Sequence, residues 1–400
     1  MADAHSAGPL AGTTIIENAS FIAGPSACLG LAKLGAQVIR IDPLGGGPDS
    51  DRWPVDPCGT SIYWHTLNRG KRSVALDLRS DTGRRLAMDL ITAPGTGGGI
   101  LVENGAARRH LDDALLRERR ADLIHVGVTG RADGAPAVDY TVNAATGVPG
   151  LTGPADSERP VNHVLPAWDL LCGQAVVSAV LLGLLRRATT GRGSFETIAL
   201  EDVALSAVAD LGWYTEALAA DRPRHGNHLF GTFGTDFATA DGRHIMVTAI
   251  TVRQWRGLVE ATGRGDVVTA LAQALEADFE AEDQRYAHRA VLEAVFAPWF
   301  AQRTCAQACA ALGETGALFA PYATAAEAAA AWPSTPVLDR VEHSAAGPLI
   351  TGASPIRVDG AYLRADAPVR LGADTRSVLA ERLGLTAAEL DDLAAQGVIA

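Results

Sequence analysis

One aspartate in the chain stands where its carboxylate could act as a nucleophile. Asp169 ends the segment Val164-Leu-Pro-Ala-Trp-Asp169 and is followed by an apolar run over residues 170–185. This pattern predicts a helix that begins at Asp169, so that the carboxylate faces unpaired backbone N–H groups and the positive end of the helix. Capping the helix is one role for this side chain. Covalent catalysis by an ionised carboxylate is another, and the two are compatible.

A basic segment, Leu67-Asn-Arg-Gly-Lys-Arg-Ser73, could bind an anion. It contains Lys71, one of only two lysines in the chain, and directly precedes a predicted strand over residues 73–78. Guanidinium and ammonium groups hold phosphates by charge and by paired hydrogen bonds. A charged turn exposed to solvent has the same composition, so both readings stay open for this segment.

Two more polar residues stand near the ends of other predicted strands. Arg40 lies near the end of a strand over residues 36–42, and Asn104 follows a strand over residues 99–103, with Arg108 and Arg109 behind it. Open α/β sheets bind ligands beyond the carboxyl ends of their strands. Groups suited to anions at three successive loops therefore point to one polyanionic ligand.

Strand and helix patterns alternate through the first part of the chain, which predicts an α/β fold with a Rossmann-like parallel sheet covered by helices on both faces. Gly24, Gly30 and Gly35 do not form G-x-G-x-x-G, so we expect no nicotinamide dinucleotide. The predicted strands are 13–19, 36–42, 73–78, 99–103 and 123–129, and the predicted helices are 26–34, 82–92 and 112–119.

The character of the sequence changes near residue 220. Strand patterns over 232–239 and 244–249 are followed by an Ala-rich helical stretch that reaches Trp332. We therefore expect a smaller α+β domain over residues 220–332. Residues 1–215 are expected to form the N-terminal part of a large domain, and residues 333–400 to return to it and complete it.

Bulk properties exclude several classes of function. A net charge of −12 argues against nucleic acid as a partner. Five scattered cysteines without a CxxC pair indicate reduced thiols in a cytoplasmic protein, and neither Cys305 with Cys309 nor His225 with His228 completes a metal site. The N-terminus has no secretory pattern, and the run 170–185 is shorter than the roughly 20 residues that span a bilayer. We therefore expect no membrane association.

A set of motifs extends from one end of the chain to the other: Pro9-Leu-Ala-Gly12, Ala23-Gly-Pro25, Leu34-Gly-Ala-Gln-Val-Ile-Arg40, residues 67–78, Thr190-Gly-Arg-Gly193, and Leu371-Gly-Ala-Asp-Thr-Arg-Ser-Val-Leu379 with Gly397-Val-Ile399. In combination they resemble the family III CoA-transferases, which include formyl-CoA, carnitine and succinyl-type CoA-transferases and alpha-methylacyl-CoA racemase. The resemblance implies coenzyme A as substrate and carrier, a small carboxylic acid as second substrate, no tightly bound cofactor, and an interlocked homodimer.

The resemblance also implies roles for single residues. The position of Asp169 carries the transferase nucleophile in that family, and backbone N–H groups at the helix start would stabilise the oxyanion. The positions that family members use around CoA match Arg40, Leu67, Asn68, Lys71, Arg72 and Asn104. We expect Arg40, Lys71 and Arg72 to anchor the phosphates.

The chain departs from the family pattern at two places. Family members usually continue Glu-Asn with an aromatic residue, Arg and Pro, whereas this chain reads Glu103-Asn-Gly-Ala-Ala-Arg108. The glycine tetrad that covers the site in formyl-CoA transferases is also missing, and the nearest loop is Gly226-Asn-His-Leu-Phe-Gly231-Thr-Phe-Gly234. The arginine that follows Asn104 and the covering loop are therefore left open.

Three segments resemble the branch of the family that moves CoA between the two carboxyl groups of one C5 dicarboxylate. They are Arg52-Trp-Pro54, residues 131–143, and Val161-Asn-His-Val-Leu-Pro-Ala-Trp-Asp169. They predict that the substrate's free carboxylate is bound by Tyr140, Asn143, Asn162 and His163, although hydrogen bonding within the loops would explain these residues too.

Two other functions stay open. The racemase branch shares the aspartate but has a histidine where this chain has Val138, directly before Asp139. A 1,1-proton transfer needs two groups that exchange protons, and His163 is the only nearby substitute. A CoA-binding module without catalysis would keep the basic residues and leave Asp169 as a cap.

Overall fold

The computed structural model describes residues 8–104, 111–343, 347–368 and 370–400. Contacts divide the chain into two units: Met1–Thr146, Val164–Thr215 and Ala331–Ala400 form the first, and Gly147–His163 and Glu216–Ala330 form the second. Residues 147–163 thus group with the second unit, whereas the sequence pattern places them in the large domain. They do so because Arg224 donates hydrogen bonds to the carbonyl oxygens of Gly150 and Arg159 at 3.1 and 3.0 Å.

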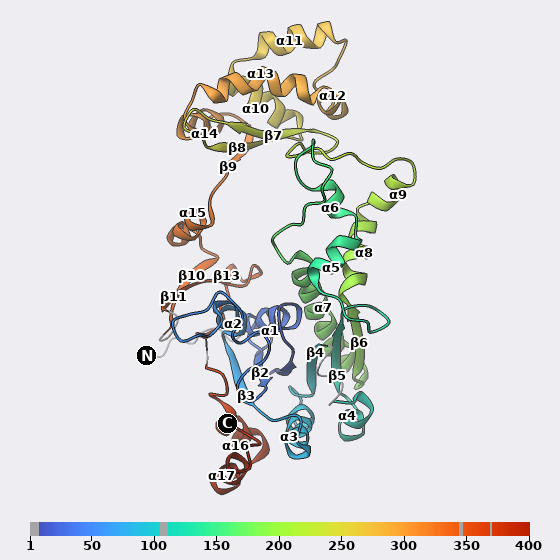
Figure 1. Cartoon of the computed structure of the whole chain (residues 1–400), viewed down its shortest axis with the longest axis vertical. Coiled ribbons are helices and arrows are strands. Elements are labelled where there is room, and N and C mark those ends of the chain that lie inside the picture. The colour runs from blue at the N-terminus through green and yellow to red at the C-terminus, as the bar shows by residue number, and fades with distance from the viewer. Residues whose placement is uncertain (1–7, 105–110, 344–346, 369) are drawn as a thin grey trace. The chain divides into compact units, whose positions relative to one another are not determined.

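The first unit is built on a parallel sheet of six strands in the order β3-β2-β1-β4-β5-β6 (Figure 1). Ile and Val favour extended backbone, and successive side chains point to opposite faces, so Ile15 enters the core on one face and Ile16 the core on the other. The predicted α/β fold with a parallel sheet is confirmed. The strands are β1 (Thr14–Asn18), β2 (Gln37–Asp42), β3 (Lys71–Ala75), β4 (Ile100–Asn104), β5 (Ile124–Thr129) and β6 (Ser194–Ala199).

Helices cover both faces of this sheet. On one face α1 (Ala23–Lys33), α7 (Ala167–Thr190) and α8 (Leu200–Asp210) bury apolar side chains such as Leu31, Val176 and Ala204. The other face is covered by α3 (Asp81–Thr92), α4 (Asp113–Arg119), α16 (Thr375–Leu383) and α17 (Ala387–Ala395). The last two helices show that the C-terminal segment returns to the first unit.

Helix α7 is longer than the apolar run from which it is predicted. It has 24 residues, and among the described residues it is the one helix long and apolar enough to cross a membrane, although length and composition alone do not distinguish it from a core helix. The expectation that this segment is too short to span a bilayer is therefore wrong. One face, which includes Cys172 and Val180, packs in the core, while Leu182 and Leu185 on the other face are exposed.

Smaller elements complete the first unit. They are α2 (Ile62–Asn68), α5 (Asp139–Ala145), the 3-10 helix η2 (Trp332–Ser334), the hairpin of β10 (Leu338–His343) with β11 (Gly347–Gly352), and the hairpin of β12 (Arg357–Val358) with β13 (Ala361–Tyr362). The short helix α9 (Trp213–Ala217) runs across the boundary to the second unit.

The second unit has its own α+β core. Its antiparallel sheet has the order β7-β8-β9, and Phe233, Val247 and Phe296 are among its fully buried side chains. The strands are β7 (Phe233–Ala238), β8 (His244–Ala249) and β9 (Leu318–Pro321), and the helices are α6 (Val148–Leu151), α10 (Val252–Thr262), α11 (Gly265–Ala274), α12 (Glu282–Ala287), α13 (Arg289–Ala301), α14 (Cys305–Gly313) and α15 (Ala325–Ala330).

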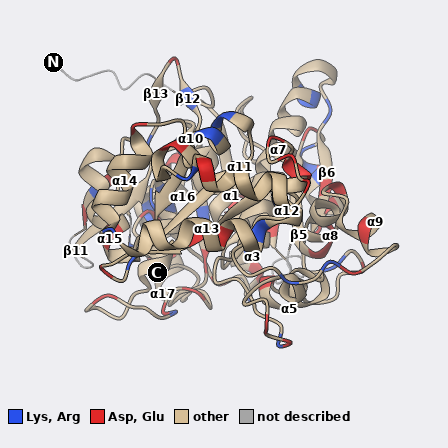
Figure 2. Ribbon diagram, turned by 90° about the horizontal axis from the view of Figure 1, so that it is seen from above, with Lys and Arg blue, Asp and Glu red and all other residues tan. Residues whose placement is uncertain are grey.

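Charged residues of both signs are interspersed along the described chain, as the blue and red segments of the ribbon in Figure 2 show. Together with the net charge of −12, this distribution provides no broad positive field for a polyanion. An anionic ligand must therefore be held by local groups.

Candidate active site

Asp169 lies in the first turn of α7, as the third helical residue rather than the first. The helix begins at Ala167, and Pro166 occupies the N-cap position without a side-chain cap. The predicted start at Asp169 is therefore wrong by two residues, and Asp169 is not the capping residue. Its carboxylate forms no ion pair with any residue that the structure describes.

The residue that caps α7 is instead Asp139, the first residue of α5. Its Oδ2 accepts hydrogen bonds from the backbone N–H groups of Trp168 and Asp169 at 2.8 and 3.2 Å. The indole Nε1 of Trp168 donates to Oδ1 of Asn143 at 3.1 Å. Helix α5 therefore fixes the backbone that carries the Asp169 side chain.

The N–H groups at the start of α7 are all engaged in this structure. Besides the two bound by Asp139, the N–H of Ala167 donates to Leu165 O and that of Leu170 to Pro166 O, at 2.8 and 3.1 Å. Asp139 and backbone carbonyls therefore occupy these groups in the absence of substrate, and their stabilisation of an oxyanion stays a prediction.

The environment makes Asp169 more basic than an ordinary aspartate. Burial, and to a smaller extent the charge of Asp139, raise the pKa of its carboxyl to about 6 against the opposing effect of Arg52. The group is half-buried. Above pH 6 it is an ionised carboxylate held in a partly dry environment, which is the form required of a nucleophile.

Two groups near Asp169 carry no predicted role. Tyr63 of α2 has a raised pKa because of burial, with further contributions from Asp169, Tyr140 and Asp139. Arg52 is exposed, with its Cζ 5.6 Å from the ring centre of Phe21. The segment around Arg52 contributes to the family resemblance, but a surface arginine and a helical tyrosine give no signal of a site by themselves.

The four residues predicted to bind the substrate are divided between the two units. Tyr140 and Asn143 belong to α5 in the first unit, where the Tyr140 hydroxyl donates to Val164 O at 3.4 Å and Asn143 is buried against Trp168. Asn162 and His163 belong to the second unit. The substrate contacts stay a prediction for all four.

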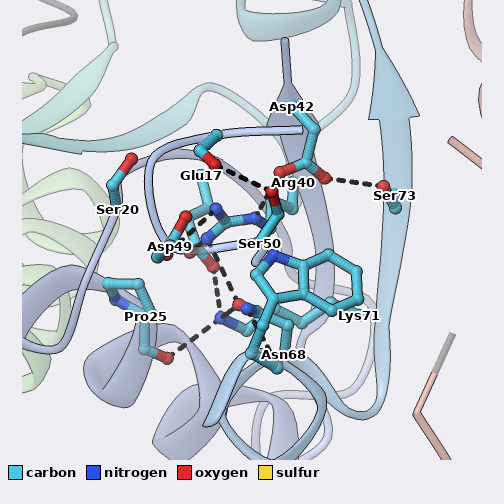
Figure 3. Close-up of polar contacts among 12 residues, drawn as sticks. Glu17, Ser20, Pro25, Arg40, Asp42, Asp49, Ser50, Asn68, Lys71 and Ser73 are labelled. Carbon is cyan, nitrogen blue, oxygen red and sulfur yellow. Dashed lines mark hydrogen bonds and ion pairs between the residues drawn. The ribbon is translucent and has the colours of Figure 1, made fainter. Parts of the chain in front are cut away.

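The residues predicted to bind CoA include a buried polar cluster, which Figure 3 shows. Arg40 is 1% exposed, and its guanidinium lies 2.8 Å from Glu17 Oε1, 2.7 Å from Asp42 Oδ1 and 3.6 Å from Asp49 Oδ2. Burial alone would lower the pKa of Arg40, but these three carboxylates outweigh it and raise the pKa.

Lys71 and Asn68 belong to the same cluster. The Lys71 ammonium lies 2.7 Å from Glu17 Oε2 and donates to Pro25 O at 3.0 Å and to Asn68 Oδ1 at 2.8 Å. Burial lowers the pKa of Lys71 despite the neighbouring Glu17. Sequence reasoning missed Glu17, although its place in the first strand, beside the strand that carries Arg40, is a usable signal.

The other predicted CoA residues lie apart from this cluster. Arg72 points to the opposite face of β3, where it lies 2.6 Å from Glu381 Oε2 of α16. Leu67 is half-buried on α2. Asn104 exchanges hydrogen bonds with the backbone of Ser20 at 2.8 and 3.3 Å, which joins the carboxyl ends of β4 and β1. Phosphate binding by Arg40, Lys71 and Arg72 stays a prediction.

Two other expectations concern the arginines after Asn104 and metal binding. Arg108 and Arg109 lie outside the described residues. No group of three or more His, Cys, Asp or Glu side chains in the described part of the chain could hold a metal ion.

Comparison with known proteins identifies relatives of the whole chain. The chain is 41% identical over 401 residues to 2-methylfumaryl-CoA isomerase of Chloroflexus aurantiacus, covering 98% of each chain. It is 29% identical to succinyl-CoA:mesaconate CoA-transferase of Haloarcula hispanica, over 74% of this chain and 75% of that one. A CAIB/BAIF family protein from Brucella suis has a similar structure, with a TM-score of 0.79, 25% identity, and coverage of 94% and 100%.

The sequence profile of CoA-transferase family III matches residues 10–375, which include Asp169, Asp139 and the buried cluster around Arg40. The profile therefore spans both units and nearly the whole chain. The chain is an enzyme of CoA-transferase family III.

Proposed function

We propose that this enzyme moves CoA from C1 to C4 of 2-methylfumaryl-CoA, between the two carboxyl groups of one C5 dicarboxylate, through a covalent intermediate on Asp169. The observation that carries the proposal is a half-buried, basic carboxylate in the first turn of α7 with no ion-pair partner among the described residues. The similarity to 2-methylfumaryl-CoA isomerase supports the choice of substrate.

The reaction balances without an external reagent. A carboxylate oxygen of Asp169 attacks the thioester carbonyl, the C–S bond breaks, and a mixed anhydride and CoA thiolate form. The thiolate then attacks the aspartyl carbonyl, which releases the dicarboxylate and leaves an aspartyl-CoA thioester. The other carboxylate of the same molecule attacks this thioester, and the returning thiolate attacks the acyl carbon, which restores Asp169.

Arg52 supports a dicarboxylic substrate. Its guanidinium is exposed and forms no ion pair with the described residues, while its charge acts on Asp169 and Tyr63. We infer that it binds the substrate carboxylate that is not attached to CoA, since guanidinium groups bind carboxylates through two parallel hydrogen bonds. Turning the diacid end for end would then exchange the two carboxyl groups between Arg52 and Asp169.

CoA binding is proposed for Arg40, Leu67, Asn68, Lys71, Arg72 and Asn104. Arg40 and Lys71 already pair with carboxylates, so phosphate contact requires one of those pairs to open, whereas Arg72 lies at the surface. Calorimetric titration with CoA tests this assignment. Unaltered affinity after separate removal of the charges at Arg40, Lys71 and Arg72 would refute it.

We propose a homodimer in the cytoplasm. The face of α7 with Leu181, Leu182 and Leu185 is at least 40% exposed at each leucine, and Phe195 of the edge strand β6 is 47% exposed. Exposed apolar side chains gathered on one helix commonly mark an interface. All five cysteines are free thiols, in keeping with a reducing compartment.

Alpha-methylacyl-CoA racemase is the second candidate, because that branch shares the family fold and the aspartate. Val138 precedes Asp139 in the sequence and has no exchangeable proton on its side chain. A CoA-binding protein without catalysis is a third candidate. Two incubations in deuterium oxide separate the three, one with 2-methylfumaryl-CoA alone and one with a saturated 2-methylacyl-CoA. Formation of the C4 isomer in the first supports our proposal, deuterium at the α-carbon in the second supports the racemase, and no change in either supports simple binding.

A further inference from the structure

Asp139 places a second carboxylate against the backbone of the nucleophile. It is 2% exposed, and its Oδ2 binds the N–H groups of both Trp168 and Asp169. Its Oδ1 is buried and has no hydrogen-bond partner among the described residues. A buried carboxylate oxygen without a partner is costly, so Asp139 is a poor choice if a helix cap is all that is needed here.

The charges around Asp169 do not neutralise the carboxylates of Asp139 and Asp169. In the part of the chain that the structure describes, the titratable or charged groups that act on Asp169, or that Asp169 acts on, are Asp139 from α5, Arg52 from the loop before α2, Tyr63 from α2, and Cys172 one turn further along α7. Arg52 is the only cation in this set, and it is exposed to solvent. The start of α7 therefore carries two carboxylates that act on each other with little compensating charge.

We propose that Asp139 is a positioning residue for the transfer reaction: it holds the backbone of Asp169 and, by its negative charge, favours the neutral covalent states of that side chain over the free carboxylate. This inference rests on the proposed role of Asp169 as nucleophile. It adds a residue to which the resemblance between this chain and its family assigns no role.

The physical reason lies in the change of charge during the reaction. The free Asp169 carboxylate is negative, whereas the mixed anhydride and the aspartyl-CoA thioester carry no charge on that side chain. Repulsion from Asp139 is present in the free enzyme and disappears when either covalent bond forms. The same repulsion makes the carboxylate more basic and hence a better nucleophile. Asp139 thus raises the free energy of the resting state without weakening the intermediates.

The substitution Asp139→Asn separates charge from geometry, because the amide oxygen can still accept the two N–H groups. We expect kcat on 2-methylfumaryl-CoA to fall by at least tenfold with little change in KM. We also expect the acid limb of the kcat/KM profile to move from near pH 6 to a lower pH. A matched control is Asp112→Asn, since Asp112 caps α4 through the N–H groups of Ala114 and Leu115, and the neighbouring Asp113 is paired with Arg117 and His125. This control should leave both parameters unchanged.

A readout independent of turnover keeps the inference separate from the proposed function. In protein labelled with ¹³C at the aspartate carboxyls, the Asp169 signal is assigned by its loss in Asp169→Asn, and its titration is compared in wild type and Asp139→Asn. A titration that moves to lower pH supports the proposal even if 2-methylfumaryl-CoA proves to be the wrong substrate. An unchanged titration and an unchanged kcat would overturn it and leave Asp139 as a cap. If Asp139→Asn does not fold, Asp139→Glu provides a second test, because it keeps the negative charge but displaces it. We expect this variant to lower kcat while the acid limb of the kcat/KM profile stays near pH 6. An acid limb that moves to lower pH in Asp139→Glu would overturn the proposal.

Discussion

The ammonium of Lys71 lies 2.7 Å from Glu17 Oε2 in the interior of the first unit, with both side chains at most 1% exposed. This ion pair joins β3 to β1, and Glu17 also binds Arg40 of β2 through its other oxygen. A single carboxylate therefore connects three strands of the sheet. Lys71 and Arg72 are successive residues of β3 and point to opposite faces of it, so Lys71 lies in the interior and Arg72 at the surface.

Lys71→Met should destabilise the protein by about 3 kcal/mol, because breaking a buried pair leaves an uncompensated charge on its partner. Arg72→Gln is the control, since an exposed pair contributes about 0–1 kcal/mol. Urea unfolding followed by circular dichroism measures both. Equal free energies of unfolding for the two variants would show that the Lys71–Glu17 pair does not stabilise the sheet.

Asp169→Asn should stabilise the protein at neutral pH. The carboxyl has a pKa of about 6 in the folded state and an ordinary value near 3.8 in the unfolded chain, so the folded state binds more protons between these values. Its ionised form therefore weakens the fold above pH 6, and this penalty disappears as the pH falls toward 4. We expect Asp169→Asn to add about 1–2 kcal/mol at pH 8, after allowance for partial solvent exposure, and much less at pH 4. Denaturant unfolding at the two pH values checks the sign, and a gain larger at pH 4 would contradict it.

Arg52→Gln should raise KM for 2-methylfumaryl-CoA by 10-fold or more, because the neutral amide loses the charge-assisted pair with the free carboxylate. CoA affinity should not change, since Arg52 is not among the proposed CoA contacts. Steady-state kinetics and titration with CoA give the two numbers. A fall in kcat with an unchanged KM would instead assign Arg52 to the reacting atoms.

Leu182→Lys combined with Leu185→Lys should convert the proposed dimer to monomers. Both side chains are more than 60% exposed in the single chain, so charges there cost little unless a partner covers them. Sedimentation velocity gives the mass of the particle, and circular dichroism verifies the helix content. A wild-type protein that sediments as a monomer would refute the proposed dimer directly.

The sequence predicts the sheet well because its strands are short Ile- and Val-rich runs separated by helical patterns, and such local periodicity needs no tertiary information. Strand β3 is the exception: it begins at Lys71 because buried Glu17 and Asn68 satisfy the ammonium, and a charged residue does not signal a strand. The start of α7 fails for a similar reason, since the cap comes from Asp139, 30 residues away.

The site is predicted only in part. Asp169 has a local signal, the junction of a polar residue with an apolar helix. Asp139 and Arg52 become informative only when distant segments are brought together. Glu17 has a signal only in its place on the strand beside the one that carries Arg40. Likewise, Asn162 and His163 belong to the second unit because Arg224 contacts residues 150 and 159.

The central claim is that Asp169 becomes covalently attached to CoA or to the acyl group. The most direct test is to mix the enzyme with 2-methylfumaryl-CoA, reduce it with borohydride, digest it, and identify the modified peptide by mass spectrometry. Borohydride reduces an aspartyl thioester or anhydride to an alcohol but leaves a free carboxylate unchanged. We predict substrate-dependent reduction at Asp169 alone, absent without acyl-CoA. An unmodified Asp169 in an enzyme that still forms the C4 isomer would contradict the covalent mechanism.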